Sequence, residues 1–256
     1  MFYFSKPAGG LYVGKALVKP PFVHLVSAGL PVRGLFVSDI HIRKNTWPVA
    51  EHVISAIKTL NAELVLLGGD YAEYDEGLTR FFEALSHVKP KYGIYAVEGN
   101  NDYPRFHEDH ERVKREIEKS GARLLRDECA FIQTDKGAIE ILGARCAYFE
   151  ETHPEGLFSE KDGVFRILIA HEPLKSTLKA VNGKADLMLS GHTHGGQVNV
   201  LGFTCYELLQ YEGSCRYTHL AGLKKVGKTS VLVSRGIGTS KFAVRFGARP
   251  EIHLIT

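Results

Sequence analysis

Short apolar runs and amphipathic stripes alternate along the first half of the chain. Three apolar runs of strand length each end in a polar cluster: residues 34–38, 64–67 and 92–97. Residues 51–60 and 78–88, which lie between these runs, repeat their apolar positions at helical spacing. The charged segment 108–119 predicts a surface helix. This alternation predicts parallel strands connected by helices.

The second half of the chain predicts more strands and fewer helices. Residues 129–134 and 138–143 form a predicted hairpin around Asp135-Lys136-Gly137. Further strands are expected at 164–170, 186–190, 230–234 and 251–255, with a short helix at 173–181. The first 33 residues predict one or two strands that cover a sheet edge. Because no linker or repeat interrupts the pattern, we expect one domain over residues 1–256 with two packed sheets.

Composition narrows the class of protein without naming a function. The chain has 256 residues, 44% of them hydrophobic and 24% charged, which excludes a disordered chain. A net charge of +3 is too small to predict a nucleic-acid partner. Basic residues gather near the C-terminus, as a solvated face or as a contact for an anionic substrate or membrane surface: Lys224, Lys225, Lys228, Arg235, Lys241, Arg245 and Arg249.

The cysteines and the apolar runs bear on the compartment. None of the four cysteines, at 129, 146, 205 and 215, forms a CxxC pair, which argues against a cysteine metal site. Free thiols in a reducing cytosol are the first expectation, and a Cys205–Cys215 bridge is the alternative in an oxidising compartment. No apolar run reaches the roughly 18 residues of a membrane-spanning helix. We therefore expect a cytoplasmic protein, with peripheral membrane contact as an alternative.

Potential metal ligands follow five of the predicted strands. The clusters are Asp39-Ile40-His41, Gly69-Asp70, Gly99-Asn100-Asn101-Asp102, His171 and Gly191-His192-Thr193-His194. Because ligands of open α/β sheets bind beyond the carboxyl ends of the strands, five such clusters can form one site. Oxygen and imidazole donors without a thiolate suit Mn²⁺, Zn²⁺ or iron. The pattern therefore predicts a metal site at the strand ends.

The same motifs, in this order, resemble the calcineurin-like metallophosphoesterase family from about Gly34 to Gly196. The resemblance implies an α/β fold, a four-layer α-β-β-α sandwich of two mixed sheets, with two divalent ions at the strand ends. It assigns one ion to Asp39, His41 and His194, and the other to Asn100, His171 and His192. Asp70 would bridge the two ions. We expect Mn²⁺ in both positions, with Zn²⁺ or iron as alternatives.

One position departs from the family pattern. The family usually has a histidine where this chain has Asn101. An amide donates a hydrogen bond but does not transfer a proton at neutral pH. Another acid could replace the histidine, and the candidates are His107, His110 and His153. Asp102, which would orient the missing histidine, is interpreted first as a residue that stabilises the turn.

Three further residues have two interpretations each. Arg43 and Arg235 could grip a substrate phosphate, or they could be ordinary surface arginines. Glu172 could orient a ligand imidazole, or it could be an acidic residue that begins the helix expected at 173–181. Three further segments resemble the bacterial envelope branch of the family, which includes enzymes similar to UDP-diacylglucosamine pyrophosphatase. They are Gly195-Gly196-Gln197, Ser234-Arg235-Gly236-Ile237-Gly238 and Arg249-Pro250-Glu251-Ile252.

These observations predict a hydrolase that attacks a phosphoester with a metal-activated hydroxide. Asp70, Asn100 and Asn101 are the expected catalytic residues. Phosphodiesters or pyrophosphates are favoured over monoesters, because without an acid the leaving group must be a good one. Two alternatives stay open: a lipid-linked nucleotide pyrophosphatase at the membrane surface, and a metal-containing scaffold without catalytic activity. The oligomeric state is not predicted.

Overall fold

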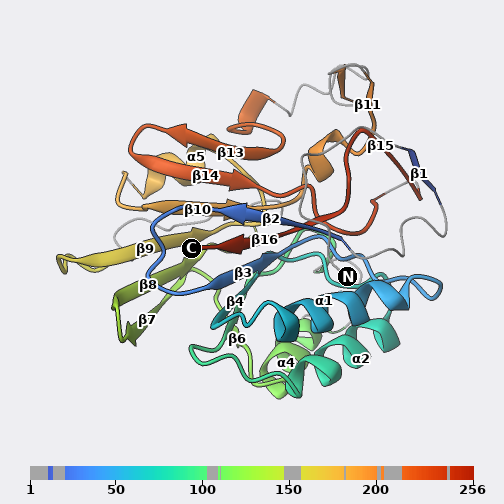
Figure 1. Ribbon diagram of the computed structural model, residues 1–256, viewed down its shortest axis with the longest axis horizontal. Coiled ribbons are helices and arrows are strands. Elements are labelled where there is room, and N and C mark those ends of the chain that lie inside the picture. The colour runs from blue at the N-terminus through green and yellow to red at the C-terminus, as the bar shows by residue number, and fades with distance from the viewer. Residues whose placement is uncertain are drawn as a thin grey trace.

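Two six-stranded mixed sheets lie face to face in the computed structural model (Figure 1). The structure describes residues 11–13, 21–102, 109, 111–146, 157–181, 183–200, 203–204, 215–240 and 243–256. The first sheet has the order β2 (Phe22–Val26), β16 (Glu251–Ile255), β3 (Gly34–Val37), β4 (Leu64–Leu67), β5 (Ile94–Ala96) and β6 (Arg123–Leu124). The second has the order β13 (Gly222–Val226), β14 (Thr229–Val233), β10 (Leu187–Ser190), β9 (Val164–Ile169), β8 (Gly137–Gly143) and β7 (Glu128–Thr134).

Strands that carry the predicted clusters are parallel to their neighbours. In the first sheet β3, β4, β5 and β6 run in the same direction, with Leu35 opposite Val65 and Leu66 opposite Tyr95. In the second sheet β8, β9, β10 and β14 are also parallel. Every residue of β3, β4 and β10 is buried, as expected where both faces of a strand are covered. The carboxyl ends of these strands therefore meet at one edge of each sheet.

Helices cover the outer face of each sheet. Among the described residues, α1 (Trp47–Thr59), α2 (Asp75–Ser86) and α4 (Arg112–Lys119) pack on the first sheet, and α5 (Lys175–Ala180) packs on the second. An apolar layer that includes Phe36, Leu66, Ile141 and Leu189 fills the space between the sheets. The expected four-layer α-β-β-α sandwich is confirmed.

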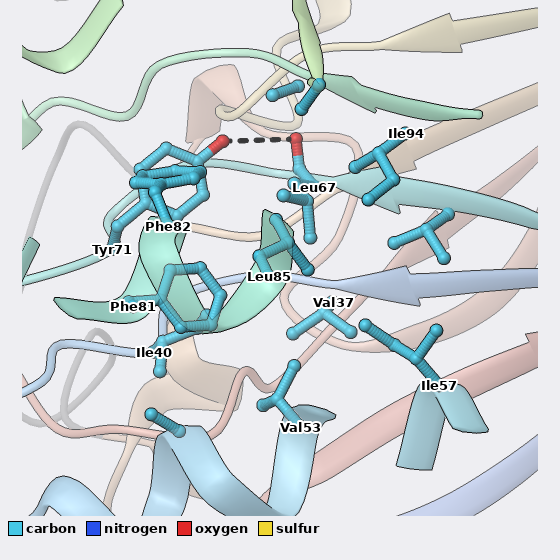
Figure 2. Close-up of a cluster of buried hydrophobic side chains, with 14 of the residues drawn as sticks. Val37, Ile40, Val53, Ile57, Leu67, Tyr71, Phe81, Phe82, Leu85 and Ile94 are labelled. Atoms are coloured by element: carbon cyan, nitrogen blue, oxygen red, sulfur yellow. Dashed lines mark hydrogen bonds between the residues drawn. The ribbon is translucent and has the colours of Figure 1, made fainter. Parts of the chain in front are cut away.

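The core under α1 and α2 also fixes the position of the turn after β4. Figure 2 shows Phe81 and Phe82 of α2 packed around Tyr71, with Val53 and Ile57 of α1 on the same side of the sheet. The ring of Tyr71 is 5.1 Å from that of Phe82, and its hydroxyl donates to the carbonyl of Val97 at 2.6 Å. Because Tyr71 follows Asp70 directly, this packing holds the Asp70 turn against the sheet.

Several elements differ from the expected ones. Helix α1 begins at Trp47 rather than at residue 51, because Pro48 is compatible with the first turn of a helix. Strand β5 spans only Ile94–Ala96, where residues 92–97 were expected. The pattern did not predict β13, which is Lys-rich and exposed at the edge of its sheet, where lysines discourage pairing with another chain.

Five further strands in the described part of the chain have only two or three residues each, too few to show an alternating pattern, so none of them was predicted at its position. Strand β6 extends the first sheet by two residues. The others lie outside the two sheets: β11 (Asn199–Val200) pairs with β12 (Phe203–Thr204), and β1 (Leu11–Val13) pairs with β15 (Val244–Phe246). Strand β2 forms the edge of the first sheet.

Two predictions about the surface have separate outcomes. No helix in the described part of the chain is both long and apolar enough to cross a membrane. Lys224, Lys225 and Lys228 are exposed, but Arg245 is fully buried and Arg235 pairs with the buried Glu251, so the basic residues near the C-terminus do not form one solvated face. Lys241 lies outside the described residues.

Candidate metal centre

Seven side chains singled out in the sequence come together between the carboxyl ends of the two sheets. Asp39 and His41 follow β3, Asp70 follows β4, and Asn100 follows β5 in the first sheet; His171 follows β9, and His192 and His194 follow β10 in the second. Hydrogen bonds continue past the ends of β3 and β4, from the amide of Asp39 to Gly69 O at 2.9 Å and from the amide of His41 to Asp70 O at 3.0 Å. These bonds align the first two clusters.

The donor atoms form two adjoining groups. One ligand atom from each of Asp39, His41 and His194 lies within 4.8 Å of the others, and the same holds for Asp39, Asp70 and His171. In the second half of the site, Oδ1 of Asn100 lies 2.6 Å from Nδ1 of His192 and 3.1 Å from Nε2 of His171. The carboxylate of Asp39 is therefore close to both groups, although the family resemblance assigned it to one ion only.

Asp70 belongs to the second group and also approaches His41 of the first. Its Oδ2 is 3.3 Å from Nε2 of His41 and 3.5 Å from Nε2 of His171. Two donors of one ion, each about 2.0–2.2 Å from it, are roughly 3 Å apart, so these separations suit ligands of shared ions. Nε2 of His41 is buried and lacks a well-aligned hydrogen bond among the described residues, as suits an atom turned toward a cation. The donor set therefore fits divalent metal ions.

Each histidine is oriented through its other ring nitrogen. Nδ1 of His41 lies 2.6 Å from Oε1 of Glu73, and Nδ1 of His171 lies 2.7 Å from the carbonyl of Gly68. These acceptors resemble the carboxylates and carbonyls that orient ligand histidines in metal sites. Nε2 of His192 lies 2.9 Å from the hydroxyl of Tyr217. Nδ1 of His194 accepts from the guanidinium of Arg245 at 2.9 Å, so its Nε2 faces Asp39 at 3.6 Å.

Buried opposite charges shift the pKa values of the donors. Burial disfavours charged imidazoles, but Asp70 together with Glu73 and Asp39 outweighs it and raises the pKa of His41 to about 9. Asp70 and Asp39 likewise overcome burial and raise the pKa of His171 to about 10. The two histidines in turn hold the pKa of Asp70 well below its usual value, despite its burial. Without an ion, the site therefore carries protons that a metal must displace.

The remaining two histidines are poor bases. Burial, with the positive charge of His171 as the next contribution, lowers the pKa of His192 to about 3. Burial and the guanidinium of Arg245 lower the pKa of His194 well below its usual value. Both imidazoles are therefore neutral at physiological pH, which is the state that binds a metal ion.

The backbone is strained at most of these predicted ligands. Asp39, His41, Asp70, His192 and His194 all have a φ between 43° and 69°, in the left-handed region that side chains rarely adopt. Such conformations persist only where the surrounding structure holds them, and they gather at functional sites. Among the described residues, only Asn61, Asp127 and Gln197 share this feature without being predicted ligands.

Asn101 and Asp102 both act on the Asp70 turn. The side-chain amide of Asn101 donates to Asp70 Oδ2 at 2.6 Å, and its backbone amide donates to Oδ1 at 2.8 Å. The buried carboxylate of Asp102 accepts from the backbone amides of Asp70 at 2.7 Å, Tyr71 at 3.0 Å and Gly99 at 2.8 Å. The interpretation of Asp102 as a turn-stabilising residue is confirmed, and it joins two turns rather than one.

The other candidates lie at the border of the site. The guanidinium of Arg43 donates to the carbonyls of Thr239 and Ser240, and that of Arg235 donates to Oε2 of Glu251 at 2.7 Å. Their role in substrate binding stays a prediction. Glu172 is buried 3.8 Å from Nε2 of His192, too far for a hydrogen bond. His107, His110, His153 and Cys205 lie outside the described residues.

Three residues that orient the predicted ligands were not expected from the sequence. Glu73 follows Asp70 by three positions, but nothing in that spacing distinguishes it from a surface acid. Tyr217 and Arg245 are distant in sequence from the histidines that they contact, and no local pattern marks either residue. Only the packing of the two sheets brings these side chains to the site.

Comparisons with known proteins identify the family of this chain. The family model for the calcineurin-like phosphoesterases matches residues 32–196, more than half of the chain. The chain is 32% identical to the uncharacterized protein YpbG of Bacillus subtilis, over 88% of this chain and 81% of that protein. It is 29% identical to the uncharacterized metallophosphoesterase YkoQ of Bacillus subtilis, over 88% and 84% of the two chains.

A relative named as a phosphodiesterase is similarly close. The chain is 28% identical to phosphodiesterase YaeI of Escherichia coli, over 88% of this chain and 82% of that protein. The family model begins just before β3 and ends just after His194, so it spans every predicted ligand. With its ligand clusters at the ends of parallel strands, this chain is a metal-binding hydrolase that belongs to the calcineurin-like phosphoesterase family.

Proposed function

We propose that the protein hydrolyses phosphodiesters or pyrophosphates at a centre of two divalent metal ions. The observation that carries this proposal is that Asp70 approaches a histidine of each group, with its Oδ2 within 3.5 Å of Nε2 of both His41 and His171. A pair of divalent ions supplies positive charge for a phosphoryl group and a water of lowered pKa. Carboxylate, amide and imidazole donors favour Mn²⁺, Zn²⁺ or iron.

Each ion would be held by a different set of side chains, with one carboxylate in common. Asp39, His41 and His194 would hold one ion, and Asn100, His171 and His192 the other, with Asp70 shared. The carboxylate of Asp70 is held by two hydrogen bonds from Asn101 and faces both groups. Because its negative charge lies between two cation sites, it offsets part of their mutual repulsion. Asp70 is therefore the residue on which the two-ion arrangement depends most.

Replacing Asp70 with alanine tests this arrangement. We expect Asp70→Ala to lose two-ion binding and nearly all activity toward bis(p-nitrophenyl) phosphate, measured by elemental analysis and by nitrophenolate release with Mn²⁺ present. Asp162→Ala, which removes an exposed carboxylate, is the matched control and should retain two ions and the full rate. Two bound ions and an undiminished rate in Asp70→Ala would show that the ligand assignment is wrong.

The substrate preference follows from Asn101. Its amide holds Asp70 but has no proton to give to a leaving group, and general acids typically contribute about 10²–10⁴-fold to a rate. A substrate with a stable leaving group, such as an aryl diester or a pyrophosphate, needs this help least. We therefore propose that such substrates are preferred over alkyl esters.

Rates on three substrates test this preference. With Mn²⁺ present, we expect bis(p-nitrophenyl) phosphate to react faster than an alkyl phosphodiester. p-Nitrophenyl phosphate releases the same p-nitrophenolate, so its rate compares a monoester with a diester at a constant leaving group. Asn101→His should narrow the gap between the activated and the alkyl diester, because it restores a proton donor, while Asn101→Ala should not. A wild-type enzyme that hydrolyses the alkyl diester faster than the activated one would refute the leaving-group argument.

Membership of the bacterial envelope branch is a finer proposal. Two parts of that branch's pattern pack against each other, since a Cβ atom added at Gly195 would lie only 2.7 Å from Cγ of Arg235. This contact supports a common role near the ion site for both parts. Membership of the branch would be supported if a lipid-linked nucleotide diphosphate in detergent is hydrolysed faster than the same nucleotide without a lipid. Equal rates on both would count against it.

A further inference from the structure

A fully buried arginine lies directly behind one of the metal ligands. Arg245 on β15 has no exposed surface and is the largest fully buried side chain in the described part of the chain. Its guanidinium donates to Nδ1 of His194 at 2.9 Å and to the carbonyl of Arg235 at 2.8 Å, and its Nε donates to the carbonyl of Gly238 at 2.7 Å. A buried guanidinium is costly unless its donors are satisfied, so these contacts define its position closely.

The same side chain joins three loops. One further bond, from Nη1 to the carbonyl of Ala248 at 3.2 Å, reaches the loop after β15. His194 belongs to the loop after β10, and Arg235 and Gly238 belong to the loop after β14. The planar guanidinium offers five donors in a fixed fork, a geometry that an ammonium group lacks. Arg245 therefore sets the distance between the His194 loop and the loop after β14.

The loop after β14 in turn holds Asp39. The backbone amide of Gly238 donates to the carbonyl of Asp39 at 2.7 Å, and that of Ile237 donates to it at 3.2 Å. A Cβ atom added at Gly236 would lie only 2.5 Å from Cβ of Asp39, so the loop passes closely against this residue. Arg245 thus contacts His194 directly and reaches Asp39 through two hydrogen-bonded steps.

The other half of the site is oriented by different groups. His171 is held by the carbonyl of Gly68, and His192 lies against the hydroxyl of Tyr217. The contacts of Arg245 among the described residues go to neither of these histidines nor to Asn100. Arg245 therefore acts directly on the group that contains His194. It reaches the other group only through Asp39, whose carboxylate also accepts from the backbone amide of His192 at 3.0 Å.

We propose that Arg245 is a positioning residue for one ion site, the one formed by Asp39, His41 and His194. The proposal rests on the two-ion centre proposed above. A contact behind a ligand histidine typically contributes about 10- to 100-fold to metal affinity. Arg245 sets the orientation of the His194 ring and the position of Asp39 together, so its loss should weaken that ion by a factor in this range.

The test titrates metal-free protein with Mn²⁺ and counts the ions bound. Wild type should bind two ions. Arg245→Lys and Arg245→Gln should each retain one ion with unchanged affinity and bind the other about 10- to 100-fold more weakly. The electron paramagnetic resonance signal should change from that of a coupled manganese pair to that of a single ion. Thermal unfolding of each metal-free variant identifies those that fold.

Two backgrounds assign the weakened ion. In His192→Ala, which spares the Asp39 group, adding Arg245→Lys should weaken the remaining ion about 10- to 100-fold. In His194→Ala, the same substitution should leave the remaining ion unaffected. This difference separates positioning from general loosening of the fold, which would weaken both ions in both backgrounds.

Several results would overturn the inference. Equal weakening of both ions or unchanged affinities would each contradict the inference. Tighter binding in Arg245→Gln would also contradict it, because it would show that the guanidinium acts on the ion mainly by electrostatic repulsion. If Arg245→Gln does not fold, Arg245→Lys retains the charge and gives the same readout. Wild type that binds fewer than two ions would refute the proposed two-ion function itself, independently of the variants.

Discussion

At the scale of single residues, the site combines ordinary donors with unusual surroundings. Asp70 and His171 are both fully enclosed by protein, and their opposite charges compensate each other. Burial alone would discharge each of them, but the pair favours the charged forms. The same pairing occurs between His41 and the carboxylates of Asp70 and Glu73. A metal ion bound at these atoms would therefore compete with the protons.

This competition predicts that metal affinity rises with pH. The pKa values of about 9 for His41 and about 10 for His171 lie above the unperturbed value, so both imidazoles carry a proton at neutral pH in the metal-free protein. An ion must displace these protons, and each one displaced raises the apparent affinity about tenfold per pH unit below the pKa. Calorimetric titration with Mn²⁺ between about pH 6.5 and 8.5 measures this slope.

The sign of that slope is the critical result. Wild type should bind more tightly at the higher pH and should release protons, which calorimetry in buffers of different ionisation enthalpy counts directly. His41→Asn provides the control, because it removes one of the two protons and should reduce the slope by about one. An affinity that falls or stays constant as pH rises would show that these histidines are not protonated in the metal-free protein.

At the scale of elements, the turns after the strands decide where the ligands lie. Gly236 shows how closely they pack, with a φ of 65° and no room for a Cβ beside Asp39. Gly163 has almost the same backbone, with a φ of 68°, but nothing lies within 4 Å of the position that its Cβ would occupy. The two glycines differ in crowding rather than in conformation. They form a matched pair for the effect of the Asp39 contact.

Substitution of each glycine by alanine separates strain from crowding. Gly163→Ala should lower the free energy of unfolding by about 1–2 kcal/mol, the cost of a left-handed alanine. Gly236→Ala should cost more, because Asp39 must also move, and it should reduce the Mn²⁺ content. Chemical unfolding and elemental analysis measure the two effects. Equal losses of stability with full metal content in both variants would show that the Gly236 contact is unimportant.

At the scale of the whole molecule, the site connects the two sheets. Asp39, Asp70 and Asn100 belong to the first sheet, and the histidines that face them, at 171, 192 and 194, belong to the second. Apolar side chains fill the remaining interface, and the amide of Asn100 approaches the imidazoles across it. Ions bound here would hold the ends of the two sheets together, in addition to their chemical role.

Removal of the metal should therefore lower thermal stability. At a free ion concentration of about 100 times the dissociation constant, one bound ion adds about 2.7 kcal/mol to the free energy of unfolding. For a chain of this size that corresponds to roughly 5–10 °C in the unfolding midpoint. Calorimetric scans before and after chelation, and after Mn²⁺ is restored, measure the shift. An unchanged midpoint in wild type, or an equal shift in Asp70→Ala, would contradict the prediction.

The sequence by itself determined the buried strands, the order of the ligand clusters and the identity of the donors. Runs such as Leu64–Leu67 are apolar throughout because both faces of the strand are covered, and a fully apolar run is visible without a structure. The clusters at Asp39, Asp70 and His192 could be predicted because each directly follows such a run. Strand β13 was missed because its exposed, Lys-rich positions do not show the burial that makes a strand recognisable.

Only the tertiary structure decided how these donors are oriented. Glu73, Tyr217 and Arg245 contact the predicted ligand histidines although they are distant from them in sequence. No local pattern of residues indicates these contacts. The left-handed backbone at Asp39, Asp70 and His194 is likewise imposed by packing, because residues of these types favour other conformations when free. Donor chemistry belongs to individual side chains and can be read along the chain. Orientation comes from neighbours that become adjacent only when the two sheets pack together.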